Sequence, residues 1–437
     1  MSDPRFDARS GAVIGRRDGA VLRATGIPYA TAARFGGPAP AADRTEPFVA
    51  HDWSPQAPQP ADPIADTMFG VDPRGRATDE HCQHLSITLP AAPASTPRPV
   101  LVWVHGGGFV TGAGDLAIMD PAALVTEQDV VVVTVTYRLG LLGFIETPHG
   151  PRANLGLLDL IEAFRWIRRN IAAFGGDPAS VTAFGQSAGA QALVDLMATK
   201  DAAQLFTRAV IQSAPLGIMR GRAALNRALA AAAAPLGASS TLADVAAVQE
   251  QVVATGARFG LKGAMPIAPQ YGCAPLPPEA EVDAALASVA PAIDVLIGST
   301  TEEARLFLPS LPGVDTWSRL PVVGGMLERL VVWFCTWAVY TRGVRRFARR
   351  HRRAGGLVST YALSWAALGN PIGAAHTIDL PLLLGDQTAW ADAQLIAGTP
   401  YAEVAADGRR MRALWARFAR GEQLGAGDSL EFLALRG

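Results

Sequence analysis

Residues 181–190 read Val-Thr-Ala-Phe-Gly-Gln-Ser-Ala-Gly-Ala. Ser187 is the centre of a Gly-x-Ser-x-Gly pentapeptide, with strand-like residues before it and the helix-compatible run 188–197 after it. This strand–turn–helix context is that of a nucleophile elbow, in which a sharp turn exposes a serine hydroxyl. Glycines flank the serine because a side chain there would collide with the crossing strand and helix. Because chains rich in Gly, Ala and Ser also contain this pentapeptide by chance, the other parts of a site are needed.

The segments around the elbow predict an α/β fold. Residues 100–104 and 130–137 are continuously apolar, so both faces of each strand should be buried, as in a parallel sheet. Residues 155–174 have helical periodicity and stop at a glycine pair. Further strands are expected at 209–212, 294–298 and 359–364, and helices at 225–235, 243–254, 279–289, 324–350 and 403–420. This alternation predicts a wound, mostly parallel sheet flanked by helices.

Composition limits the function classes. The chain has 437 residues, of which 49% are hydrophobic, and 38 basic residues balance 39 acidic ones. That is enough for a sizeable core in one large α/β domain spanning 1–437, and the near-zero net charge argues against nucleic acid as a partner. A Pro- and Ala-rich stretch at 38–79 is expected to be a long surface loop that lines a pocket. The basic run 342–353 is expected to be the solvated end of a helix.

The cysteines argue against both a disulfide framework and a zinc site. Cys82, Cys273 and Cys335 are few and scattered, and their spacing fits no zinc pattern. We therefore expect no metal, no cofactor and a reducing cytoplasm as the location.

No membrane anchor is expected. The N-terminal residues 1–7 are polar and lack the apolar core of a signal peptide. The most apolar stretch, 320–341, carries Glu328 and Arg329, and its uncharged part, 330–341, is too short to cross a bilayer. A buried or lid-like helix near a hydrophobic pocket is the better interpretation.

A glycine run directly after the first apolar strand provides candidate oxyanion donors. Residues 105–109 read His-Gly-Gly-Gly-Phe and lack the Lys-Ser/Thr ending of a phosphate-binding loop. Three glycines let backbone N–H groups turn inward toward the oxyanion that forms when Ser187 attacks a carbonyl. The N–H of Ala188, directly after the serine, is the expected additional donor. His105 lies on the strand side of this loop and is interpreted as structural.

A base and an acid should follow Ser187 in the chain. Of the two downstream histidines, His351 is surrounded by arginines, which would disfavour its imidazolium and expose it to water. His376 lies on a loop of small residues after a strand, so we predict that it is the base. Glu302 and Glu303 both follow the strand at 294–298, and their side chains should point apart. Periodicity alone does not choose between these two carboxylates.

These residues resemble the type B carboxylesterases, a family that includes bacterial para-nitrobenzyl esterases and cholinesterases. The resemblance extends from Gly26 to about Leu384. The blocks that match in order are 26–30, 105–109, 137–140, 154–159 and 174–182. It implies an α/β-hydrolase fold with a helical lid or cap insertion at about 305–350.

Position by position, the resemblance implies a catalytic triad and an oxyanion hole. Ser187 falls on the family's nucleophile, Glu303 on its acid and His376 on its histidine. The implied oxyanion donors are Gly107, Gly108 and Ala188.

The resemblance also implies supporting residues around the triad. Ser213 falls on a serine that assists the histidine, and Asp379 falls on a carboxylate three residues after that histidine. Two structural ion pairs are implied, Arg34 with Glu80 and Arg138 with Asp159.

Three departures from the family pattern are informative. Gln186 stands where Glu usually precedes the nucleophile, which removes a negative charge beside the serine and argues against a choline ester. Cys82 has no evident partner for the usual disulfide loop, and Ala304 stands where Gly is usual.

The sequence thus predicts a serine hydrolase that cleaves small-molecule carboxylic esters of mainly neutral, apolar character. A non-catalytic binding module is the alternative from another class, although all three triad positions are filled. Acyl transfer and carbamate or amide hydrolysis use the same machinery and stay open, as do the natural ester and the oligomeric state.

Overall fold

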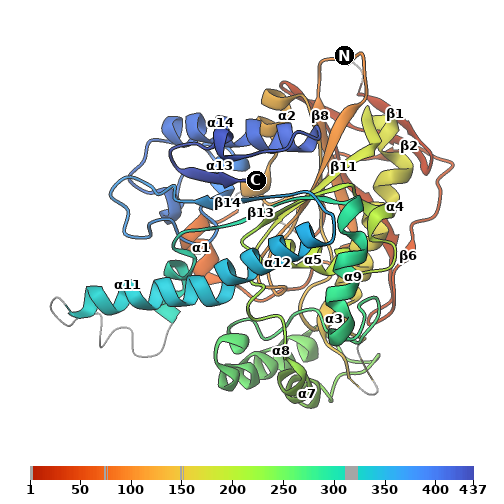
Figure 1. Ribbon diagram of the computed structural model, residues 1–437. Coiled ribbons are helices and arrows are strands. Elements are labelled where there is room, and N and C mark those ends of the chain that lie inside the picture. The colour runs from red at the N-terminus through yellow and green to blue at the C-terminus, as the bar shows by residue number, and fades with distance from the viewer. Residues whose placement is uncertain (1–2, 73–74, 76, 148–149, 151, 311–322) are drawn as a thin grey trace.

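The computed structural model describes residues 3–72, 75, 77–147, 150, 152–310 and 323–437, and within these a ten-stranded sheet forms the centre (Figure 1). Its order is β15-β14-β13-β12-β11-β9-β10-β8-β4-β3. The six strands from β14 to β10 run parallel, and antiparallel pairing begins at β15 on one edge and at β8 on the other. The bounds are β3 (Arg16–Asp18), β4 (Val21–Pro28), β8 (His84–Pro90), β9 (Arg98–Val104), β10 (Val131–Val135), β11 (Gly176–Gln186), β12 (Arg208–Gln212), β13 (Asp294–Thr300), β14 (Val358–Leu363) and β15 (Leu433–Arg436). The predicted mostly parallel α/β sheet is confirmed.

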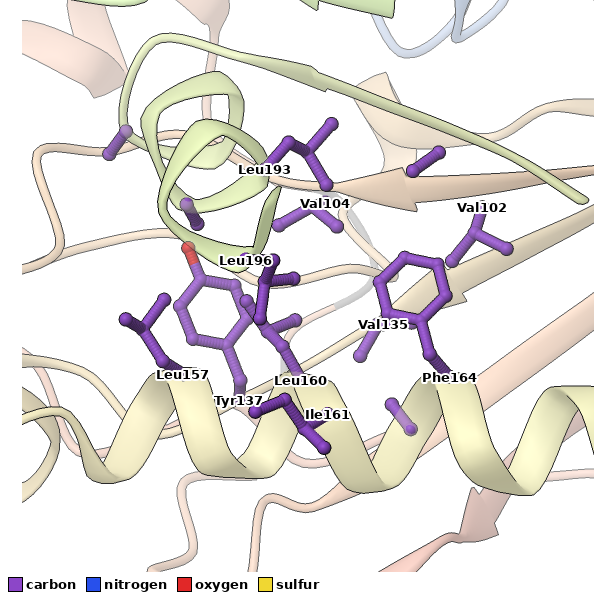
Figure 2. Close-up of a cluster of buried hydrophobic side chains, with 14 of the residues drawn as sticks. Val102, Val104, Val135, Tyr137, Leu157, Leu160, Ile161, Phe164, Leu193 and Leu196 are labelled. Atoms are coloured by element: carbon purple, nitrogen blue, oxygen red, sulfur yellow. The ribbon is translucent and has the colours of Figure 1, made fainter. Parts of the chain in front are cut away.

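Helices cover both faces of the sheet, which explains the continuous apolar strands. Alternate residues of β9 enter different cores: Val102 and Val104 pack in one cluster, Leu101 and Trp103 in the other. Figure 2 shows the first cluster, where the strand valines face α4 (Leu155–Asn170) and α5 (Ala188–Met197). The helices on the opposite face are α2 (Ala122–Gln128), α13 (Leu380–Leu383) and α14 (Tyr401–Ala419). A strand buried on both sides has no solvent face, so its sequence does not alternate.

The stretch 38–79 contains more structure than a loop. It holds the short strands β6 (Ala39–Pro40) and β7 (Phe48–Val49) and the helix α1 (Pro63–Phe69). The expectation of an irregular segment was wrong at α1, because Asp62 caps the helix by accepting a hydrogen bond from the Ala65 N–H at 3.0 Å and Pro63 takes the first helical position. Residues 73, 74 and 76 of this stretch lie outside the described residues.

The remaining elements lie around the sheet. They are β1 (Arg5–Ala8), β2 (Gly11–Ile14), β5 (Ala30–Thr31), α3 (Gly140–Phe144), α6 (Ala202–Leu205), α7 (Ala223–Ala232), α8 (Leu242–Gly256) and α9 (Val282–Val289). The predicted helices near 225–235, 243–254 and 279–289 correspond to α7, α8 and α9.

The insertion at 305–350 is helical where it is described. A 3-10 segment covers Glu303–Ser310, and α11 (Val323–Thr336) passes through a π-helical turn, Trp337–Thr341, into α12 (Arg342–Arg353). Figure 1 shows α11 projecting beyond the sheet. Residues 311–322 of the predicted insertion lie outside the described residues. Across the described part of the chain, no helix has the length and apolar character needed to cross a membrane.

Candidate active site

Ser187 occupies the sharp turn between β11 and α5. Its φ of 56° and ψ of −121° are unusual for a residue with a side chain. The turn is held because the Ser187 N–H donates to the Gln212 carbonyl at 2.8 Å. A Cβ on Gly189 would come within 2.0 Å of the Val104 carbonyl oxygen, so glycine is required where α5 crosses β9. The local sequence therefore forms the elbow that the pentapeptide predicted.

His376 is paired with Glu303. The His376 Nδ1–H donates to Glu303 Oε2, and both side chains are buried. The other oxygen of Glu303, Oε1, accepts the Thr300 N–H at 2.8 Å. The His376 N–H also donates to the Glu303 carbonyl at 3.2 Å, so the main chain and the side chain both fix the pair. This arrangement orients the imidazole so that its other nitrogen, Nε2, points away from Glu303.

The neighbouring carboxylate points elsewhere. Glu302 accepts hydrogen bonds from Arg305 Nη2 at 2.6 Å and from the Ala374 N–H at 3.1 Å. The two adjacent carboxylates diverge as expected, and Glu303 is the one that contacts His376.

Gln186 connects the histidine to the elbow. Its Nε2 lies 3.2 Å from His376 Nε2, and its side chain is buried. Because Gln186 directly precedes Ser187, this contact places Nε2 of the imidazole beside the elbow. The structure thus brings Glu303 and His376 to the residue before Ser187, and among the described residues no hydrogen bond joins Ser187 Oγ to His376.

Two aromatic rings that sequence reasoning missed flank the histidine. The rings of Phe307 and Tyr340 each lie 5.3 Å from the His376 ring, centroid to centroid. Burial, together with the charge of Glu303, raises the pKa of Tyr340 and keeps its phenol neutral. Both rings belong to the insertion that was predicted to be lid-like. That prediction was the signal in the sequence that could have pointed to them.

The glycine loop after β9 lies against the elbow. A Cβ on Gly106 would be 3.2 Å from Ser187 Cβ. Gly107 and Gly108 have φ of 100° and 62°, conformations that favour glycine. No group in the described chain accepts a hydrogen bond from either N–H, and Ala188 is the first residue of α5, so its N–H has no partner in the helix.

His105 is a structural residue, as expected. Its ring is buried, lies 2.8 Å from the Gly106 carbonyl through Nδ1, and stacks on Tyr137 with centroids 4.5 Å apart. It supports the start of the glycine loop.

A buried polar network lies behind the histidine–glutamate pair. Gln212 Nε2 donates to Asp379 Oδ2, and Trp415 Nε1 donates to Gln212 Oε1 at 3.1 Å. Burial raises the pKa of Asp379 to about 6, and the charge of Glu303 adds to this effect. Gln212 and Trp415 were missed, although the polar Gln-Ser pair at the end of a buried strand was a signal for the first.

Ser213 is not brought into hydrogen-bond contact with His376. Its N–H donates to the Gly298 carbonyl at 2.9 Å, and its buried Oγ has no hydrogen-bond partner among the described residues. The assisting role implied for Ser213 stays a prediction.

The expectation that His351 is exposed to water was wrong. Its side chain is buried, its Nε2 lies 2.9 Å from the Ile293 carbonyl oxygen, and its ring stacks on Phe347. Helical periodicity places both residues with Val344 on the inner face of α12, while most of the neighbouring arginines lie outside. Burial lowers the pKa of His351 and so disfavours its imidazolium.

Both implied ion pairs are present. Arg138 binds Asp159 through two hydrogen bonds of 2.8 and 2.7 Å, and Arg34 Nε binds Glu80 Oε2 at 2.6 Å. Cys82 is buried and unpaired, as its missing partner indicated. Within the described residues, no group of three or more His, Cys, Asp or Glu is arranged to hold a metal ion.

The parallel sheet, the serine at its elbow and the buried histidine–glutamate pair define an α/β-hydrolase of the serine type. The chain belongs to the carboxylesterase family, whose family model matches residues 2–319. It is therefore an ester-hydrolysing enzyme with a small-molecule substrate.

Individual relatives agree with this assignment. A protein named probable N-octanoylanthranilate hydrolase from Rhodococcus erythropolis is 37% identical over 423 residues, covering 94% of this chain and 91% of that protein. The para-nitrobenzyl esterase of Bacillus subtilis is 38% identical over 210 residues, which cover 46% of this chain and 42% of that protein. A solved thermophilic PNB esterase superposes with a TM-score of 0.80 at 26% identity, covering 98% of this chain and 92% of that structure.

Proposed function

We propose that Ser187, His376 and Glu303 hydrolyse a carboxylic ester through an acyl-enzyme. The Ser187 proton passes to His376 Nε2 while Oγ forms a bond to the carbonyl carbon. The ester C–O bond then breaks and His376 returns the proton to the leaving alcohol. Water then attacks the acyl carbon while His376 takes its proton. The bond between the acyl carbon and Ser187 Oγ breaks, His376 returns the proton to Oγ, and the carboxylic acid leaves. The observation that carries this proposal is the His376 ring held between Glu303 and the end of β11.

The proposed oxyanion donors are the N–H groups of Gly107, Gly108 and Ala188. Their support is the glycine loop lying against Ser187 and the position of Ala188 at the start of α5. Each such donor typically contributes about a hundredfold to a thousandfold in rate.

The proposed substrate has a neutral, apolar acyl part. The support is the pair of aromatic rings beside His376, from Phe307 and Tyr340, and the uncharged Gln186 next to the serine. In this proposal residues 1–437 form one catalytic unit in which the 38–79 stretch and the 305–350 insertion wall the pocket. The Asp62 carboxylate accepting from Thr111 Oγ1 at 3.2 Å, next to the glycine loop, supports the first wall.

An N-acyl aryl amide is the second candidate substrate. It is favoured by the relative named as an N-octanoylanthranilate hydrolase, which matches this chain over nearly its full length. Gln186 also fits this candidate, because a Glu there would repel the carboxylate of an anthranilate leaving group.

The test compares hydrolysis of 4-nitrophenyl octanoate and N-octanoylanthranilate by the wild type and by Ser187→Ala. We expect release of nitrophenol by the wild type and a loss of about 10⁴-fold or more in the variant. Equal rates in both proteins would refute the acyl-enzyme, and faster amide than ester turnover would select the second candidate.

We also propose the reducing cytoplasm as the location. The support is that Cys82, Cys273 and Cys335 are all unpaired. Fractionation of the source cells tests this.

A further inference from the structure

A row of large apolar side chains is exposed along α11 and the turn that follows. We call it the apolar stripe; it consists of Met326, Leu330, Trp333, Phe334 and Trp337. Met326 is 73% exposed and Trp333 61%. The spacing of four, three and four residues from Met326 to Trp337 places these side chains on one helix face. Single exposed apolar residues are ordinary, but a contiguous row marks an interaction site.

The helix that carries the stripe is attached to the body by its opposite face. Val332 is buried, and Thr336 Oγ1 accepts the Ala304 N–H at 3.2 Å. In the π-helical turn the Val339 carbonyl accepts the Gly217 N–H at 2.8 Å. The stripe is therefore presented outward from an anchored base, and α11 projects beyond the sheet in Figure 1.

The stripe continues into a basic surface. Arg342 stacks over the Trp337 ring, with its Cζ 5.6 Å from the ring centroid. Arg345 and Arg349 are exposed on the following turns of α12, and Arg329 is exposed beside the stripe. Among the described residues, no acidic side chain forms an ion pair with Arg329, Arg345 or Arg349.

This charge pattern favours an anionic bilayer over a second copy of the chain as the partner of the apolar stripe. Glu328 is the acidic residue of α11, and it is already paired with Arg305 at 2.7 Å. A second copy of the stripe would bring arginines toward arginines without a compensating carboxylate. Helices with Trp, Phe and Leu on one side and arginines flanking them bind at the surface of anionic bilayers.

We propose that the apolar stripe docks on an anionic phospholipid surface. The aromatic side chains enter the headgroup region, and Arg342, Arg345 and Arg349 pair with lipid phosphates. Tyr340, in the π-helical turn after α11, lies with its ring against His376. Docking of the stripe therefore brings the candidate active site to a surface where apolar esters concentrate. That consequence rests on the proposed function, whereas the docking itself does not require Ser187.

The test measures cosedimentation of the full chain with phosphatidylcholine vesicles that contain or lack phosphatidylglycerol. We expect partition onto the anionic vesicles by the wild type and equally by Ser187→Ala, weakened by salt. The double variant Trp333→Ser/Phe334→Ser should bind about tenfold more weakly or worse. Arg345→Glu/Arg349→Glu should also lose about tenfold or more. Val49→Ser and Arg17→Glu, which change an exposed apolar side chain of β7 and an exposed arginine of β3, should bind like the wild type.

Three outcomes overturn the docking. They are no partition of the wild type, equal partition of the stripe variants, and a dimer in solution that Trp333→Ser/Phe334→Ser dissociates while vesicles bind nothing. Unchanged melting temperatures and far-UV circular dichroism spectra show that the tryptophan–phenylalanine and arginine variants are folded. Vesicle binding by a wild type that hydrolyses no ester would refute the proposed function and leave the docking intact.

Discussion

His376 and His351 are both buried, and each uses a ring nitrogen in a hydrogen bond, yet their surroundings differ. His376 is bonded to the Glu303 carboxylate and faces the end of β11, whereas His351 faces the Ile293 carbonyl from the inner side of α12. A carboxylate stabilises an imidazolium that forms during a reaction; burial with a neutral partner disfavours it. The hydrogen-bond partner of a buried histidine, rather than its burial, therefore indicates a catalytic base.

Replacing the two histidines in turn gives the largest expected contrast. His376→Gln should lower kcat/KM for an aryl ester by about 10⁴-fold or more, because the serine loses its base. His351→Gln should stay within about threefold of the wild type, since glutamine can still bond the Ile293 carbonyl. Steady-state kinetics check this, with circular dichroism as the control for folding. A comparable loss in both variants would contradict the assignment of the base.

Replacing Glu303 and Glu302 in turn tests which carboxylate supports His376. Glu303→Gln should reduce kcat by about 10³- to 10⁴-fold, because the amide no longer holds and compensates the imidazolium. Glu302→Gln should change kcat by less than about threefold, since this side chain serves Arg305 and Ala374. If only Glu302→Gln loses rate, the acid is misassigned.

Gln186 contacts the other nitrogen of His376 and directly precedes the serine. Gln186→Glu would place a negative charge at this point, so kcat/KM for an aryl ester with an anionic acyl group should fall by about tenfold relative to kcat/KM for a neutral aryl ester. The measurement is this ratio of kcat/KM values at one pH, with Gln186→Met as the uncharged control. An unchanged ratio would mean that Gln186 does not face the substrate.

The smallest expected effect is a change in the pH dependence of stability when His351 is replaced. Its pKa in the folded state is lowered by burial, so as pH falls below about 6.5 the unfolded chain binds the proton first and the protein loses stability. Above that pH both states are neutral and the contribution is complete. His351→Gln should therefore show a smaller drop in melting temperature between pH 7.5 and 5.5 than the wild type. Parallel curves for the two proteins would argue against a buried neutral imidazole.

Much of the fold followed from local patterns. The apolar runs at β9 and β10 and the glycine-flanked serine depend on neighbours in sequence, so the sheet and the elbow were predictable. The helix α1 was missed because a single capping aspartate and a proline start it within an otherwise irregular stretch. His351 was wrongly predicted to be exposed, because that prediction relied on its charged neighbours in the sequence. The 3.6-residue period of α12 determines which side chains face inward.

Local sequence patterns were sufficient to predict a wound α/β sheet, a serine at a sharp turn, and a small set of downstream acids and bases. These depend on periodicity and on glycines at fixed offsets, which act over a few residues. The packing of the insertion determines which rings flank His376 and that α11 exposes an apolar stripe, and it brings to His376 the carboxylate of Glu303 that the family resemblance had implied. Those contacts join the segments that follow β13 and β14 with the π-helical turn after α11, and these segments are separated by tens of residues in the chain. Their geometry depends on how the sheet and the insertion pack, and no local pattern encodes that packing.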